Sequence, residues 1–363
     1  MNRKRDLNAD LIRCVAVYSV LSVHFLLNSG FYSVPVEGAG MFVMCIYRSC
    51  FMVCVPLFLI LTGYLMWQKK LSASYYRGLW KTVEIYLLAS VVCLLYKKFA
   101  QSQDVTIKSA ILDILDFKAA NYSWYIEMYI GLFLMIPFLN GAYHSLADKR
   151  QKQILILTMT ALTMLPKLLN NFNFTVEGWW SSPVLSDKYN GLVPGFFTAM
   201  YPVTYYFIGA YLREYGCRIS RLKNLLLFAA AVILFGAYNY YRSDGLSFQW
   251  ESNSTWGGEN QITAVLLFIL LLNLYPDRWP KLIQEALIQI SKVSLALYLL
   301  SWIFDQEIYS VLKSLVPSAE DRWIYIPLIV PSVFLCAFLG AFLLYRLRDL
   351  LHIPFRLIHS KAE

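Results

Sequence analysis

Charged residues are scarce in this chain, and their scarcity excludes an ordinary soluble protein. Only 15% of the 363 residues are Asp, Glu, Lys or Arg, whereas 58% are hydrophobic and 16% aromatic. Soluble globular domains usually contain about 25% charged residues. Apolar runs long enough to cross a hydrocarbon core of about 30 Å recur along the whole length. The composition therefore predicts one integral membrane domain.

Histidine and cysteine are also few, with four and seven residues. No two cysteines have the spacing of a CxxC pair. Cys50 and Cys54 lie one helical turn apart, a spacing that suits helix packing equally well. Cysteines buried in a membrane domain usually behave as small apolar side chains. The sequence therefore predicts neither a disulfide framework nor a metal site.

The predicted architecture is an all-α polytopic membrane fold with about ten transmembrane helices. No internal repeat, low-complexity segment or soluble domain interrupts the apolar runs. The predicted spans are residues 8–30, 44–67, 80–99, 121–140, 153–169, 196–213, 223–241, 259–275, 292–311 and 323–346. We expect residues 1–346 to form the transmembrane domain. The basic and amphipathic tail over 347–363 is expected on the cytoplasmic membrane surface.

The distribution of Lys and Arg predicts that both termini are cytoplasmic. With this orientation, 21 of the 32 basic residues fall in cytoplasmic segments, nine fall outside, and Arg13 and Arg48 lie within spans. Cytoplasmic loops of membrane proteins are enriched in Lys and Arg in this way. The net charge of +9 then follows from topology and from attraction to anionic lipid, so no nucleic-acid partner is expected. The expected location is the plasma membrane, with the lipid bilayer as a partner.

The stretch from Asp10 to His24 carries the strongest signal for a functional site. Arg13 and His24 are eleven positions apart, which is about three turns of helix, so they share one face with Asp10. A charged arginine within a bilayer costs at least about 2.5 kcal/mol unless it faces a polar cavity or partner. We therefore expect this face to border a cavity.

Four ionisable residues on four predicted helices reach a similar depth in the outer half of the membrane: His24, Arg48, Glu127 and Asp305. At a rise of about 1.5 Å per residue, three of them lie about 9 Å below the outer ends of their spans. Glu127 is flanked by apolar sequence, and such a carboxylate needs protonation, hydration or a partner. We expect Glu127 and His24 to face one enclosed polar cavity, with Trp124 on its wall. Arg48 or His24 is the expected basic partner.

Single residues of this set also allow other interpretations. Arg48 could extend to an interface, and Asp305 could belong to an outer loop if its helix ends early. Trp124 could be part of an interfacial aromatic belt. The shared depth favours a functional cavity over these alternatives.

Five stretches resemble the acyltransferase-3 family of integral membrane acyltransferases. The pattern Arg13, ten residues, His24 is similar to the signature of the family's first helix. The other matching stretches, in the family's order, are VPLFLILTGYLM (55–66), YYRGLWK (75–81), SWYIEMYIGLFLMIP (123–137) and VSLALYLLSW (293–302). The resemblance covers nearly the whole chain and implies ten helices. The chain departs from the family in having no histidine near Ser301 and in offering Arg77 and Lys81 in place of closely spaced arginines.

The resemblance implies that acetyl-CoA is used on the cytoplasmic side to acetylate a hydroxyl of a cell-surface glycan or its lipid-linked precursor. The residues expected to contact donor or acceptor are Asp10, Arg77, Lys81, Arg48, Trp124 and Asp305. A sugar hydroxyl is a poor nucleophile, so a base is needed, and histidine is the side chain that most often acts as one. His24, Glu127 and Arg13 are the expected catalytic residues. Glu127 or Asp305 is expected to hold the imidazole.

Two other function classes are compatible with buried charges in kinked helices. A carrier or exporter of a small polar solute is the main alternative. Against it, the sequence contains no inverted repeat and no pair of broken helices. A non-catalytic scaffold is the third interpretation, and it explains neither the arginine nor the acidic residue within the spans.

Overall fold

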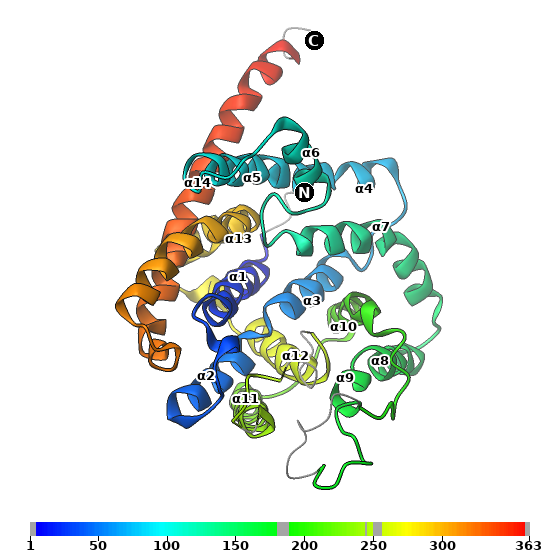
Figure 1. Ribbon diagram of the computed structural model, residues 1–363. Coiled ribbons are helices and arrows are strands. Elements are labelled where there is room, and N and C mark those ends of the chain that lie inside the picture. Colours follow the sequence, from blue (N-terminus) through cyan, green and yellow to red (C-terminus); the bar gives the residue numbers. More distant parts are fainter. Residues whose placement is uncertain (1–4, 180–188, 244, 250–255, 360–363) are drawn as a thin grey trace.

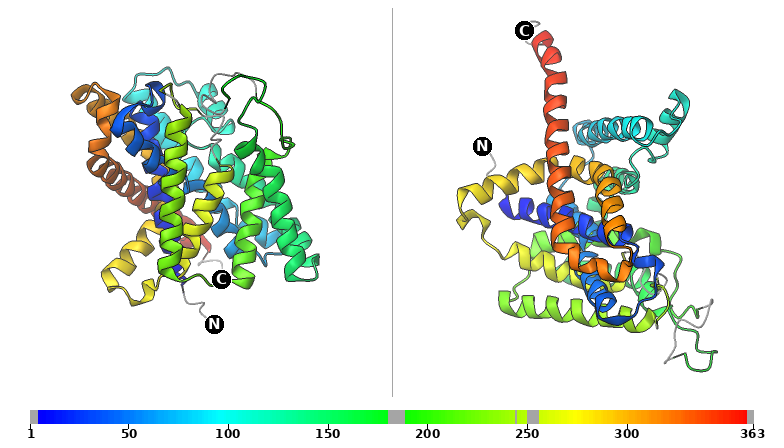
Figure 2. Two further views of the ribbon diagram at one scale, coloured as in Figure 1. Left: turned by 90° about the horizontal axis from the view of Figure 1, so that it is seen from below. Right: turned by 60° about the vertical axis from the view of Figure 1, so that its left-hand side comes forward.

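In the part of the chain that the structure describes, the regular structure is helical apart from one isolated bridge between Pro35 and Ser247. The computed structural model describes residues 5–179, 189–243, 245–249 and 256–359, and Figures 1 and 2 show their arrangement. The helices that build the bundle are α1 (Leu7–Asn28), α2 (Gly38–Phe51), α3 (Cys54–Met66), α5 (Trp80–Phe99), α7 (Trp124–Ser145), α11 (Arg221–Ser243), α12 (Gly258–Leu272), α13 (Lys281–Leu315) and α14 (Ile326–His359). The other helices are α4 (Ala73–Arg77), α6 (Ile107–Leu115), α8 (Lys149–Thr163), α9 (Leu165–Leu169) and α10 (Tyr201–Tyr215).

Eight helical segments of the described chain are long and apolar enough to cross a membrane. The predicted all-α polytopic membrane fold is thereby confirmed. The second segment combines α2 and α3, and the helix is interrupted between them at residues 52–53. The remaining two predicted spans, 153–169 and 196–213, overlap α8 with α9 and α10. Both α8 and α10 have 15 residues, a length of about 22 Å, which is less than the thickness of a hydrocarbon core.

The last helix crosses the predicted boundary between membrane domain and tail. α14 runs from Ile326 to His359 without a break at residue 346, and Figure 2 shows its end projecting from the bundle. The position of this tail relative to a membrane, and the cytoplasmic orientation of both termini, stay predictions.

α1 lies at the centre of the bundle, where it packs against α2, α3, α12, α13 and α14 (Figure 1). Its start is fixed by Asp6, whose side chain accepts a hydrogen bond from the backbone N–H of Ala9 at 3.2 Å. Such a cap satisfies a donor that the first turn leaves unpaired. The helix is followed by Gly30, whose φ of +86° lies in the left-handed region and favours glycine. The central position of α1 brings its Arg13–His24 face next to several other helices.

Two glycine contacts bring helix backbones unusually close together. A Cβ added to Gly63 of α3 would lie 2.0 Å from the carbonyl oxygen of Tyr206, and one added to Gly209 of α10 would lie 1.9 Å from that of Ile60. α11 approaches α2 in the same way, since a Cβ on Gly236 would lie 2.6 Å from the Cα of Ile46. Small residues permit such close packing between membrane helices.

α5 lies at the edge of the bundle, as the right-hand view of Figure 2 shows. It packs mainly on α13, with additional contacts to α6. Glu84 of α5 also pairs with Arg348 of α14, with 3.0 Å between Oε2 and Nε. α5 is therefore fixed to the bundle along one side.

Candidate active site

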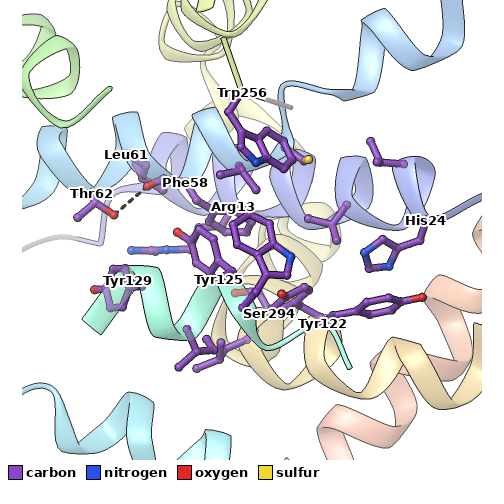
Figure 3. Close-up of a pocket in the computed structure, with 18 of the residues that line it drawn as sticks. Arg13, His24, Phe58, Leu61, Thr62, Tyr122, Tyr125, Tyr129, Trp256 and Ser294 are labelled. Atoms are coloured by element: carbon purple, nitrogen blue, oxygen red, sulfur yellow. Dashed lines mark hydrogen bonds between the residues drawn. The ribbon is translucent and has the colours of Figure 1, made fainter. Parts of the chain in front are cut away.

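A cavity of about 710 Å³ lies beside α1 and is bounded by α3, α7 and α13 (Figure 3). Arg13 and His24 both line it, which confirms that the two residues share a cavity-facing side of α1. Most of the remaining wall is apolar or aromatic, and no carboxylate is among the described residues that line it. The prediction was one enclosed polar cavity faced by His24 and Glu127, whereas the cavity has a mostly apolar lining without Glu127. The reason is that α3, α7 and α13 present leucines, valines and tyrosines to it.

His24 is 9% exposed and lies against a carboxylate from a distant part of the chain. Its Nδ1 is 3.5 Å from Oδ2 of Asp305 on α13. This is the distance of an ion pair rather than of a short hydrogen bond. The imidazole also packs on the Tyr122 ring, with 3.7 Å between ring centroids. Nδ1 has no hydrogen-bond partner among the described residues, so its contact with Asp305 at 3.5 Å is an electrostatic one.

The Asp305 carboxylate is held by a hydrogen-bond chain that begins on α1. Tyr122 donates its hydroxyl to Oδ2 of Asp305 at 2.8 Å, and Asn28 donates Nδ2 to the Tyr122 oxygen at 3.1 Å. Asp305 itself is 1% exposed, so α13 does not end before it and the outer-loop interpretation is wrong. A buried histidine with an oriented carboxylate on one nitrogen is the arrangement of a general base.

Glu127 does not face this cavity. The helix α7 begins at Trp124, three residues later than predicted, so Glu127 falls in its first turn and its side chain is exposed. No ion pair of Glu127 is present among the described residues. The prediction that Glu127 shares an enclosed cavity with His24 is therefore wrong. Asp305 is the carboxylate that occupies the predicted place beside the imidazole.

Arg48 is fully buried, with 0% of its surface exposed, so it does not extend to an interface. Its Nη1 lies 4.0 Å from Oε1 of Glu259 on α12, and its Nε donates to the Tyr32 hydroxyl at 3.2 Å. Asn239 of α11 also donates to Glu259, at 3.2 Å. Neither Arg48 nor Glu259 lines the cavity, although Tyr32 does. The predicted basic partner of Glu127 thus pairs with a different carboxylate.

The opposite end of the cavity contains Arg13 and a cluster of polar residues behind it. Asp10 is 2% exposed and receives two hydrogen bonds from Arg5, at 2.6 and 2.9 Å. Arg13 Nη1 lies 3.4 Å from Asp10 Oδ1, and Ser291 donates to the same oxygen at 2.6 Å. Asp10 therefore orients Arg13, whose side chain stays partly exposed to the cavity.

Three other residues were predicted to contact the donor or the acceptor: Arg77, Lys81 and Trp124. Arg77 ends α4 and Lys81 lies in the first turn of α5; both are exposed, and neither lines the cavity. Trp124 does line it, as predicted, and is 41% exposed. Its ring stacks on Trp256, with 5.8 Å between centroids. Figure 3 shows Trp256 on the side of the cavity opposite Tyr122.

Sequence reasoning missed Tyr122, Glu259 and Trp256, and it assigned no role to Asn28. Asn28 falls on the Arg13–His24 face of α1 by helical period, so its position was available as a signal. Tyr122 and Trp256 precede their helices in segments without periodicity, and only the packing of those segments brings them to the cavity.

The described helices and the basic, histidine-containing cavity define a polytopic membrane protein with a site suited to proton transfer. A family model described as an acyltransferase domain matches residues 6–346. The chain therefore belongs to the acyltransferase-3 family, and it is a membrane-bound acyltransferase. Comparisons with curated proteins and with solved structures found no match.

Proposed function

We propose that this membrane acyltransferase moves an acetyl group from acetyl-CoA to a hydroxyl of a cell-surface polysaccharide or of its lipid-linked precursor, at the plasma membrane. The observation that carries the proposal is that one cavity is lined by both Arg13 and His24. A cation at one end and a base at the other suit a polyanionic donor and a hydroxyl acceptor.

The donor is proposed to enter at the Arg13 end. Arg77 and Lys81 are exposed near the start of α5, and Thr82 from the same helix turn lines the cavity. These two cations suit the phosphates of coenzyme A. Arg13 and His24 are about 16 Å apart along α1, so an extended pantetheine arm passing Arg13 brings its thioester towards His24.

The chemistry is a transfer between two nucleophiles at one carbonyl carbon. Nε2 of His24 takes the proton of the acceptor hydroxyl as its oxygen bonds to the thioester carbonyl carbon. The carbon–sulfur bond then breaks, and the coenzyme A sulfur leaves with the proton that His24 returns to it. Asp305 stabilises the imidazolium between the two proton transfers, since its carboxylate lies 3.5 Å from Nδ1. A positioned base of this kind contributes about 10²–10⁴-fold to the rate.

The acceptor is proposed to bind at the His24 end. Trp124, Trp256 and Tyr122 give this end aromatic surfaces. Aromatic rings with a polar edge suit ligands that combine apolar faces and hydroxyls, as sugar rings do. The lipid-linked form of the acceptor reaches the same level from the surrounding bilayer.

The test is to incubate the purified protein in lipid vesicles with radiolabelled acetyl-CoA and an extract of surface glycans. We expect release of free coenzyme A together with label in the glycan, whereas a transporter would leave the thioester intact. Arg13→Ala should raise the KM for the donor about tenfold or more, which is the loss of one charge-assisted contact. If the intact protein neither binds nor cleaves acetyl-CoA, the proposal is wrong.

A further inference from the structure

A second hollow lies outside the active-site cavity, where α8, α10 and α12 meet (Figure 1). It has a volume of about 970 Å³ and shares no lining residue with the cavity beside α1. Its floor and walls carry apolar side chains from all three helices, namely Ile156, Leu157, Ile208, Leu212, Val265 and Ile269. We call this hollow the lateral groove. Its apolar lining on the outside of the bundle suits a hydrocarbon chain.

Two cations lie at one end of the lateral groove. Lys149 begins α8 and Arg218 follows the end of α10, and both line the groove and are exposed. Lys149 Nζ lies 5.4 Å from the centroid of the Tyr215 ring. Neither cation forms an ion pair with any residue that the structure describes. Both charges are therefore available to an anionic ligand.

The acidic residue next to this end is already neutralised. Glu214 accepts two hydrogen bonds from Lys152, at 2.7 and 2.9 Å, and a third from the Tyr143 hydroxyl at 2.8 Å. The two surrounding segments, residues 148–152 and 213–223, contain seven basic and two acidic residues. The groove thus combines a positive end with an apolar length, which is the charge pattern that complements an anionic lipid.

The positive end of the groove lies at the start of α8 and the end of α10, because Lys149 begins α8 and Arg218 follows α10. The other end of the groove is closed by Gln261, whose amide donates to the Thr160 hydroxyl at 2.9 Å. One end is therefore charged and open, and the other is neutral with its polar groups paired to each other.

We propose that the lateral groove binds an anionic phospholipid, with one acyl chain along the apolar side chains and the headgroup phosphate between Lys149 and Arg218. Basic pockets between membrane helices bind anionic headgroups in this way. The proposal does not depend on the acyl donor or acceptor, because the groove is separate from the active-site cavity.

The test counts lipid bound to the purified full-length protein by native mass spectrometry, after titration with phosphatidylglycerol or phosphatidylcholine. We expect the wild type to retain phosphatidylglycerol at concentrations where phosphatidylcholine is lost. The variant Lys149→Ala/Arg218→Ala should bind phosphatidylglycerol about 30-fold more weakly, since each basic residue near a headgroup contributes about fivefold. The matched control Arg150→Ala/Lys223→Ala removes the same charge from exposed residues of the same segments that do not line the groove. It should bind as the wild type does.

A third variant tests whether binding needs the apolar groove as well as the two cations. Val265→Trp fills the groove and keeps both cations, so it should also lose phosphatidylglycerol. Equal retention of the two lipids, equal loss in the two double variants, or unchanged binding in Val265→Trp would each overturn the proposal. All the charge substitutions are on exposed side chains, and a monodisperse elution profile verifies that each variant is folded.

Discussion

His24–Asp305 and Arg48–Glu259 are two buried ion pairs of the described chain, and they differ in their access to the cavity. His24 and Asp305 join α1 to α13 at 3.5 Å, and Arg48 and Glu259 join α2 to α12 at 4.0 Å. His24 lines the cavity, whereas Arg48 and Glu259 are enclosed by helices. Buried charge alone therefore does not identify a site, because an enclosed ion pair also holds helices in register. Access to a cavity distinguishes the two pairs.

The largest effect should follow removal of the base. We expect His24→Ala to lower kcat about 10³-fold, within the range for loss of a general base, while the midpoint of thermal unfolding changes little. The measurement is acetyl transfer with saturating donor, together with a thermal melt in detergent. His144→Ala is the matched control, because His144 is exposed and contacts a backbone carbonyl instead of a carboxylate. Near-normal turnover of His24→Ala would assign the chemistry to another group.

At the enclosed pair, Arg48 and Glu259, we expect a loss of stability with little change in activity. Arg48→Met leaves Glu259 buried beside Asn239 without its cation, and breaking a buried pair in this way costs about 3 kcal/mol. We expect less folded protein and a lower unfolding midpoint, with activity per folded molecule close to normal. Arg48→Met/Glu259→Gln should recover part of the stability, since no buried charge then lacks its partner. If Arg48→Met instead folds normally and loses activity, the enclosed pair belongs to the active site.

A smaller effect should distinguish positioning from catalysis. Tyr122→Phe removes the hydroxyl that donates to Asp305 but keeps the ring against the imidazole. We expect kcat to fall about tenfold, the value of one hydrogen bond to a charged group, with the KM of both substrates unchanged. Tyr125→Phe is a suitable control, because Tyr125 lines the same cavity and makes no described hydrogen bond to Asp305. Equal losses in the two variants would show that the hydroxyl of Tyr122 has no special role.

The smallest effect is expected at Glu127. Its side chain is exposed in the first turn of α7 and does not line the cavity. Glu127→Gln should change kcat/KM less than about twofold, as exposed substitutions usually do. A loss comparable to that of Tyr122→Phe would return Glu127 to the site and would contradict its outward orientation.

The pattern of the sequence determines depth along a helix well and rotation about its axis poorly. Arg13 and His24 lie on one helix, so the period of 3.6 residues was enough to place both on the cavity face. The rise of about 1.5 Å per residue also placed Asp305 at the level of His24, and the structure shows these two side chains in contact. Glu127 was placed at a similar depth, but its direction depends on where α7 begins and on what packs around it. A one-residue change in register turns a side chain by about 100°.

Packing between distant helices accounts for the other differences. Arg48 is fully buried because α11 approaches α2 at Gly236, whose position leaves no room for a side chain beside Ile46. Glu259 was the first residue of a predicted span, and in the structure it follows Gly258 at the start of α12 and is 5% exposed. Neither contact is encoded in a local pattern, since each joins residues about 190 or more positions apart.

The close crossing of α3 and α10 has a consequence for how substrates reach the cavity. At Gly63 and Gly209 the two backbones are in direct contact, so this wall cannot widen without losing its packing. α5 is different, because it packs mainly on one helix and carries Thr82 at the edge of the cavity. α3, backed by α10, is therefore a fixed wall of the cavity, and α5 is its less constrained side.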